Sequence, residues 1–178
     1  MQVQYQEVKG EVECKVAARR LWKAAFQDGH VCMPKAMPHT FSHVSYEGGL
    51  ASQPTFSTGA TRTMHLQPSY AEYLSKQQHP GRVVYHVKDK LEEVDNDNFK
   101  MKGRFVEGGF LDVLAKSYTQ YVHIKQGAAP NTCKVEWCIK FQPLSEQLKP
   151  QAIKAFQEYV PLGYKALEAY LLSHNDYK

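Results

Sequence analysis

The chain has 178 residues, and its 22 Lys and Arg against 18 Asp and Glu give a formal net charge of +4. Hydrophobic residues make up 43% and aromatic residues 12%, which excludes an intrinsically disordered chain and predicts a single domain over residues 1–178. No apolar run approaches the roughly 20 residues that a bilayer helix needs, so a membrane-spanning protein is excluded. The mild charge lacks a clustered basic face, which argues against a nucleic-acid partner.

The first half of the chain predicts short strands and short helices. Alternating apolar and polar residues predict a strand over residues 2–14, with a bulge near Lys9-Gly10 where the alternation slips. Apolar residues three and four apart predict a helix over 16–30 that ends at Asp28-Gly29. The elements expected next are a short helix at 30–35, strands at 40–47 and 61–66 around a loop at 50–60, and a long connection at 67–81 with a helical turn at 71–76.

The second half predicts an antiparallel meander followed by one long helix. The four expected strands, separated by turn residues, are 82–95, 99–107, 111–126 and 132–144. A helical apolar face predicts a C-terminal helix that begins near residue 145–150, with Pro161 inside it as a cause of kinking. A seven-stranded sheet against one long helix is an α+β layer architecture.

The N-terminal sequence MQVQYQE has neither the basic nor the apolar segment of a secretion signal, so we expect a cytoplasmic protein. In that compartment Cys14, Cys32, Cys133 and Cys138 are expected to be free thiols, since none forms a Cys-x-x-Cys pair. No two histidines have a zinc-ligand spacing such as His-x-Glu-x-x-His. We therefore expect no metal and no cofactor.

Four segments resemble one plant family along nearly the whole chain. They are VAARRLWKAAFQDGH at 16–30, HVKDKLEEVDNDNFK at 86–100, VEGG at 106–109 and ALEAYLLSHNDY at 166–177. The chain resembles the class-ten pathogenesis-related proteins, the family of the major birch-pollen allergen. The resemblance implies the helix-grip fold of the START-like superfamily, in which a seven-stranded antiparallel sheet and two short helices enclose a hydrophobic cavity against the long helix.

The same resemblance implies a ligand-binding function in plant defence or hormone biology. The expected partner is a small hydrophobic or amphipathic molecule such as a cytokinin, a flavonoid or an alkaloid-type metabolite, bound by a monomer or weak dimer. The chain departs from the family at its glycine-rich loop, where Gly48-Gly49 and Gly59 are split by an insertion, and at the lengthened connection 67–81. No Gly-Lys-Ser/Thr follows these glycines, so we assign no nucleotide.

Norcoclaurine synthases of this family use a Tyr, a Glu, a Lys and an Asp in the cavity. By spacing, these positions correspond to Val87, Asp89, Met101 and Gln120. Only a carboxylate remains, at Asp89, and the thioether of Met101 cannot donate a proton. The resemblance therefore disfavours that reaction, and we assign no catalytic residue.

Alternation and the resemblance together predict the residues that line the cavity. They are Ala25, Met33, His86, Met101, Phe105, Tyr118, Gln120, Val122, Phe156, Tyr159, Val160 and Gly163. The sequence leaves undecided which face of the strand at 82–91 points inward, because a slip by one residue exchanges His86 and Lys88 for Tyr85, Val87 and Asp89. We expect His86 to point inward. Gln120 offers a donor and an acceptor, which suits an amide-like or purine edge. The alternative is a filled core without a cavity.

Three functions follow from this reading. The favoured one is a carrier, store or receptor for an amphipathic metabolite. An alternative is an enzyme of specialised metabolism, such as an isomerase or cyclase, with His86 or Tyr118 as a proton shuttle. A third is an abscisic-acid-type receptor, for whose gate and latch loops Leu50-Ala51 and Ser42-His43-Val44 are poor matches.

Overall fold

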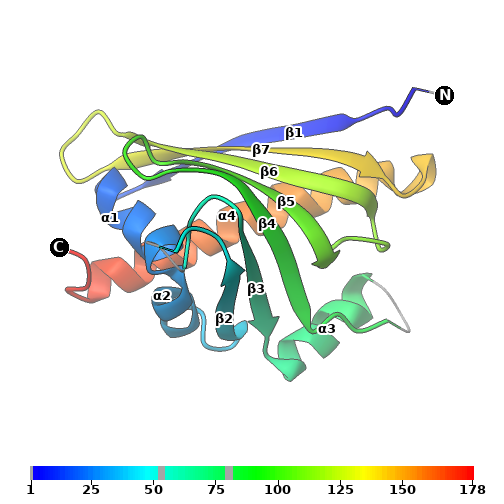
Figure 1. Cartoon of the computed structure of the whole chain (residues 1–178), viewed down its shortest axis with the longest axis horizontal. Helices are drawn as coiled ribbons and strands as arrows, with labels where there is room; N and C mark the ends of the chain where they lie inside the picture. The colour runs from blue at the N-terminus through cyan, green and yellow to red at the C-terminus, as the bar shows by residue number, and fades with distance from the viewer. Residues whose placement is uncertain (1, 52–54, 79–81) are drawn as a thin grey trace.

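The computed structural model describes residues 2–51, 55–78 and 82–178 and has the expected α+β helix-grip architecture (Figure 1). Residues 52–54 of the expected loop and 79–81 of the expected connection lie outside the described residues. The strands of the described chain form one antiparallel sheet in the order β1-β7-β6-β5-β4-β3-β2. Their bounds are β1 Gln6–Cys14, β2 Phe41–Gly48, β3 Ala60–Leu66, β4 His86–Asp95, β5 Lys100–Gly108, β6 Ala115–Gln126 and β7 Cys133–Pro143.

The helices cover one face of this sheet. Figure 1 shows α4 running along the sheet, with α1 and α2 near one end of it and α3 beside the ends of β3 and β4. The helical segments are α1 Ala18–Trp22, a π-helical turn Lys23–Gln27, α2 Gly29–Ala36, α3 Pro68–Gln78, a 3-10 turn Glu146–Leu148 and α4 Lys149–Ser173. None of the described helices is both long and apolar enough to cross a membrane.

The predicted bulge near Lys9-Gly10 is wrong. Along Gln6–Cys14, β1 pairs residue by residue with β7, and Gly10 lies opposite Trp137. A Cβ atom at Gly10 would lie 2.5 Å from Cζ2 of Trp137, so only glycine leaves room for the indole ring at this position. The break in the alternation arises because Val3 and Tyr5 precede the strand and are exposed.

Two helices differ from the sequence expectation. α2 continues through Pro34 to Ala36. The long connection holds an eleven-residue helix, α3, in place of a single helical turn. Proline suits the first turn of a helix because the amide that it lacks has no intrahelical partner there, and α3 begins at Pro68.

The core lies between α4 and the inner faces of β6 and β7. Inward residues alternate along these strands, with Tyr118, Val122 and Ile124 on β6 and Val135, Ile139 and Phe141 on β7. Phe156 of α4 packs on Phe141 with ring centroids 5.2 Å apart. The helix runs through Pro161, and Ala152, Ala155 and Phe156 in its first half are buried. Beyond this filled part, the curvature of the sheet leaves space between β3–β5 and α4.

Candidate ligand cavity

A cavity of about 560 Å³ lies between the inner face of the sheet and α2, α3 and α4. Its size falls within the range of roughly 300–1,000 Å³ that is typical of small-molecule sites. Most of its wall is apolar, and among the strands β3 contributes most, with Arg62, Met64 and Leu66. The alternative of a filled core without a cavity is therefore wrong for this part of the interior.

Seven of the residues predicted from the sequence line this cavity. They are Ala25, Met33, Phe105, Gln120, Tyr159, Val160 and Gly163. They come from the π-helical turn, α2, β5, β6 and α4, so the structure brings together residues from the first and last thirds of the chain. Binding of a ligand by these side chains remains a prediction.

Four of the predicted residues are buried behind the wall and do not line the cavity. Tyr118 stacks beneath the ring of Phe105 at 4.0 Å, and its hydroxyl accepts a hydrogen bond from the Phe110 amide at 3.2 Å. Phe156 supports Phe110 from the other side, with ring centroids 5.3 Å apart. The remaining two, Met101 and Val122, are directly paired between β5 and β6, near the part of the interior that α1 fills.

The prediction that His86 faces inward is wrong. Its side chain is 36% exposed, and Nε2 lies 2.7 Å from Oε1 of Glu107 on the side of the sheet away from α4. Val87 and Asp89 face inward in its place, the first lining the cavity and the second fully buried. The physical reason is that Asp89 can be buried because Arg62 neutralises its charge. His86, in contrast, contacts the carboxylate of Glu107 and is partly exposed to solvent.

On the outer face, His86 continues a row of histidines. His43 pairs with His65 between β2 and β3, and His65 pairs with His86 between β3 and β4. The rings of His43 and His65 stack at 3.9 Å. Burial is the main cause that lowers the pKa of His65, and the neighbouring His43 and His86 lower it further. His86 therefore belongs to a surface row and cannot act on a molecule in the cavity.

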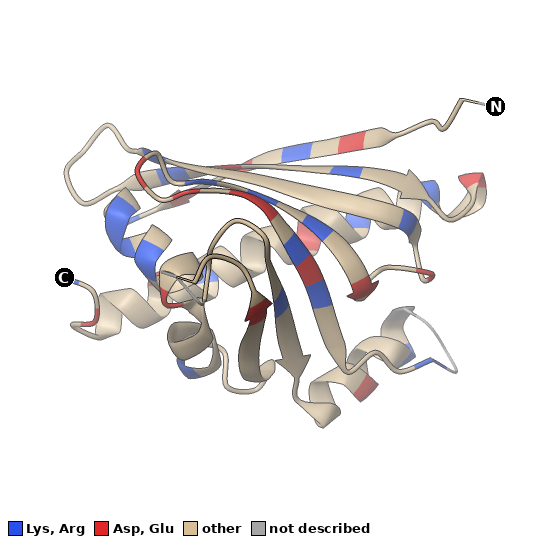
Figure 2. Ribbon diagram, in the orientation of Figure 1, with Lys and Arg blue, Asp and Glu red and all other residues tan. Residues whose placement is uncertain are grey.

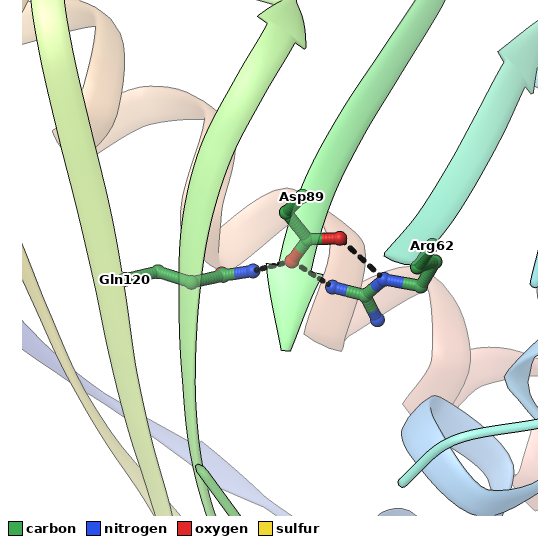
Figure 3. Close-up of polar contacts among 3 residues, drawn as sticks. All are labelled: Arg62, Asp89 and Gln120. Carbon is green, nitrogen blue, oxygen red and sulfur yellow. Dashed lines mark hydrogen bonds and ion pairs between the residues drawn. The ribbon is translucent and has the colours of Figure 1, made fainter. Parts of the chain in front are cut away.

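The polar centre of the cavity wall is a buried network of three residues (Figure 3). Nε and Nη2 of Arg62 donate to Oδ1 and Oδ2 of Asp89 at 3.0 and 2.9 Å, and Nε2 of Gln120 donates to Oδ2 at 3.3 Å. Asp89 is fully buried and Arg62 is 3% exposed. Burial alone would lower the pKa of Arg62, but the charge and hydrogen bonds of Asp89 raise it above the ordinary value. The guanidinium is therefore a permanent cation.

The surroundings of this network favour a fixed geometry. A Cβ atom at Gly103 on β5 would lie 2.5 Å from Oδ2 of Asp89, so glycine provides the space for the carboxylate. The guanidinium carbon of Arg62 lies 5.7 Å from the centre of the Phe56 ring. Figure 3 shows the remaining guanidinium nitrogen pointing away from Asp89, and Arg62 is part of the cavity wall. Gln120 binds Asp89 through its amide nitrogen, which leaves its carbonyl oxygen as an acceptor.

Comparison with known proteins decides the family. No family model matches the chain. It is 31% identical over 165 residues to pathogenesis-related protein 1 of Asparagus officinalis, with 92% of both chains covered. It is 28% identical over 171 residues to major pollen allergen Bet v 1-C of Betula pendula, with 94% of both chains covered. The chain belongs to the Bet v 1 family.

Solved structures of Bet v 1-like proteins share the fold. Ara h 8.0201 matches with a TM-score of 0.68 and 18% identity over 96% of this chain and 100% of that one. Norcoclaurine synthase from Thalictrum flavum, in complex with dopamine and hydroxybenzaldehyde, matches with a TM-score of 0.66 and 18% identity over 96% and 88%. Major latex-like protein 151 from Panax ginseng also matches, with a TM-score of 0.66 and 16% identity over 93% and 97%.

Within this Bet v 1 fold, the four positions compared with norcoclaurine synthases separate into different environments. Val87 and Gln120 line the cavity, Met101 is buried behind its wall, and Asp89 is bound by Arg62. Three of these four side chains do not titrate, and the carboxylate of Asp89 accepts three hydrogen bonds. Asp89 is the one ionisable side chain at these four positions, and it forms a buried ion pair with Arg62.

Sequence reasoning missed Arg62 and the contribution of α3. Arg62 lies in the alternating series Ala60, Arg62, Met64 and Leu66 of β3, and this period of two could have placed it on the inner face. Tyr70, Ala71, Leu74 and Ser75 of α3 also line the cavity. Their polar sequence context concealed the apolar face, which becomes evident once the connection is known to be helical.

A broader groove of about 950 Å³ lies on the outer face of the sheet, across β1 and β4–β7. Its charged side chains pair with one another, as in Lys102 with Glu92 at 3.2 Å and Lys9 with Glu7 at 3.5 Å. Figure 2 shows acidic and basic residues interspersed along these strands. Such partly or largely exposed pairs are solvated and offer little to an apolar ligand, so the smaller inner cavity is the candidate site.

Proposed function

We propose that the protein binds a small amphipathic molecule in the inner cavity and acts as its carrier, store or receptor. The observation that carries this proposal is an apolar cavity of about 560 Å³ with a buried ionic network in its wall. Enclosed apolar walls with a few fixed polar groups are typical of small-molecule sites. Membership of the Bet v 1 family supports the same reading, including a role in plant defence or hormone biology.

The network suggests which part of a ligand is polar. Arg62 and Gln120 lie on opposite sides of Asp89 in Figure 3. The guanidinium of Arg62 supplies a donor, and the carbonyl oxygen of Gln120, whose amide nitrogen binds Asp89, supplies an acceptor. A ligand that carries an acceptor next to a donor, such as an amide, a purine or a hydroxylated carbonyl compound, is complementary to this pair. Phe105, Val160 and Tyr159 provide apolar surface for the remainder of the molecule.

Filling the cavity from α4 tests the proposal directly. Gly163 lines the cavity, and nothing lies within 4 Å of a Cβ atom built at this position. Gly163→Leu places a side chain in the open space, and it also removes a glycine from a helix interior, a change that stabilises helices by up to about 1 kcal/mol. We therefore expect weaker ligand binding with an unchanged or raised melting temperature.

The measurement is native mass spectrometry of the protein with a panel of plant metabolites, followed by titration with an apolar fluorescent dye. Ala169→Leu is the matched control, because it adds the same side chain on the exposed face of α4. We expect the control to bind as the wild type does. Equal binding by the wild type and Gly163→Leu would refute the cavity as the binding site.

A further inference from the structure

Two cysteines face each other between β1 and β7, the first and last strands along the chain, which are neighbours in the sheet. Cys14 ends β1 and Cys133 begins β7, and they are direct partners in the antiparallel register. Directly opposed residues place their side chains on the same face, with Cβ atoms about 4.5–5.5 Å apart. Because a disulfide brings Cβ atoms to about 3.5–4.5 Å, only a small adjustment separates the two thiols from a bonded pair.

The two thiols already interact in the reduced protein, in which all four cysteines are free. A hydrogen bond from Cys133 lowers the pKa of Cys14 against the opposing effects of burial and Glu168, and Lys165 adds to the lowering. The same hydrogen bond and burial raise the pKa of Cys133. Cys14 is therefore the sulfur that loses its proton first, and Cys133 is the thiol beside it.

Contacts with α4 hold this corner of the sheet in place. Nζ of Lys165 donates to the carbonyl oxygen of Glu13 at 2.5 Å, and the amide of Lys15 donates to Oε2 of Glu168 at 2.5 Å. The residues on both sides of Cys14 are thus fixed to the same helix, while their own side chains are exposed. The pair is buried, and it lies at the ends of two strands, where local opening costs less free energy than in the middle of a sheet.

We propose that Cys14 and Cys133 form an oxidation site at which hydrogen peroxide links β1 to β7 through a disulfide. The Cys14 thiolate attacks one peroxide oxygen, the O–O bond breaks, and the leaving hydroxide takes up a proton to become water. The Cys133 sulfur then displaces the hydroxyl group from the sulfenic acid at Cys14 and gives its proton to the departing oxygen, forming a second water. Two thiols and one peroxide thus become one disulfide and two waters.

The other two cysteines are internal controls for this reaction. Burial, followed by Asp176 and Asp28, raises the pKa of Cys32 to about 11, which disfavours its thiolate. Cys138 pairs with Lys9 on one side and Tyr121 on the other. No cysteine is therefore the register partner of Cys138 in β1 or β6, so Cys138 is not predisposed to a disulfide within the sheet.

The disulfide would close a loop over residues 15–132, which contains β2 to β6. A cross-link between residues so far apart restricts the unfolded chain strongly, so the oxidised protein should unfold at a higher temperature. Because the bond joins strands that are already paired, ligand binding in the cavity should not change. This site is independent of the proposed ligand function.

The experiment is to treat reduced, full-length protein with hydrogen peroxide and to measure the intact mass and the non-reducing peptide map. We expect a loss of two hydrogen atoms, a cross-link between the peptides that contain Cys14 and Cys133, and a raised melting temperature that dithiothreitol reverses. A Cys32→Ser/Cys138→Ser variant should behave in the same way. Oxygen addition without a cross-link, a cross-link that uses Cys32 or Cys138, or unchanged thiols would each overturn the proposal.

Discussion

β4 carries two pairs of polar side chains on opposite faces of the sheet, and the two pairs differ in burial. Asp89 faces inward and binds Arg62 at 2.9 Å, with both side chains nearly inaccessible. His86 faces outward and binds Glu107 at 2.7 Å, with 36% and 54% of the side chains exposed. The outer contact is the shorter of the two, yet water and salt screen it. Burial, and not distance, decides which pair the fold depends on.

The largest expected effect comes from removing one partner of the inner pair. Asp89→Ala leaves the guanidinium of Arg62 buried without a counter-charge, and such a change costs about 3–5 kcal/mol of folding free energy. Urea denaturation measures this loss. An Arg62→Met/Asp89→Leu double variant removes both charges and should recover much of the stability. A cost below about 1 kcal/mol for Asp89→Ala would mean that the pair is solvated.

The next effect concerns ligand affinity. Gln120→Leu keeps both hydrogen bonds between Arg62 and Asp89 and removes an acceptor from the cavity wall. Leaving the polar edge of a ligand without its hydrogen-bond partner costs about 1–3 kcal/mol of binding free energy, or roughly ten- to hundredfold in affinity. Titrations with a cytokinin-like ligand and an apolar dye should show the loss for the first ligand only. Equal losses for both ligands would contradict the inward placement of Gln120.

A smaller effect is expected from breaking the outer pair. The hydrogen bond from His86, with the charge of Lys88, lowers the pKa of Glu107 below its usual value. A lowered carboxyl pKa stabilises the fold above the unfolded-state value near 4.3, and this stabilisation is lost as the pH falls through the folded-state pKa. Glu107→Gln should therefore reduce the melting temperature slightly at pH 7 and not at pH 3. If Glu107→Gln destabilised the protein at pH 7 as much as Asp89→Ala does, the outer pair would matter to folding as much as the buried pair, contrary to our expectation.

The smallest effect is the pH dependence of the histidine row. Burial, followed by His43 and His86, lowers the pKa of His65, so the unfolded chain binds a proton more readily than the folded chain. This contribution favours folding above the unfolded-state pKa of about 6.5 and opposes it as the pH falls below that value. His65→Asn should flatten the rise of melting temperature between pH 5 and 7.5. His39→Asn, at an exposed position outside the row, is the control and should leave the slope unchanged.

Local patterns in the sequence were sufficient for the order of the strands, for α4 and for the family. Period-two alternation predicted the strands, a helical apolar face predicted α4, and the family resemblance on segments such as 86–100 is confirmed by curated relatives. These features depend on residues close together in the chain. The same reasoning placed Gln120 and Gly163 on the cavity wall, because their neighbours along β6 and α4 determine which side is apolar.

Only the tertiary structure decided which face of β4 is buried. It also decided which apolar residues line the cavity and which fill the core behind its wall. Alternation defines two faces but not which one is inside, and Asp89 can face inward only because Arg62 arrives from β3. Tyr118 and Phe156 fit the apolar pattern as well as Phe105 does, yet packing against Phe110 places them behind the wall. The register between β1 and β7 likewise joins Cys14 to Cys133. Each of these outcomes depends on a partner distant in the chain, which no local pattern contains.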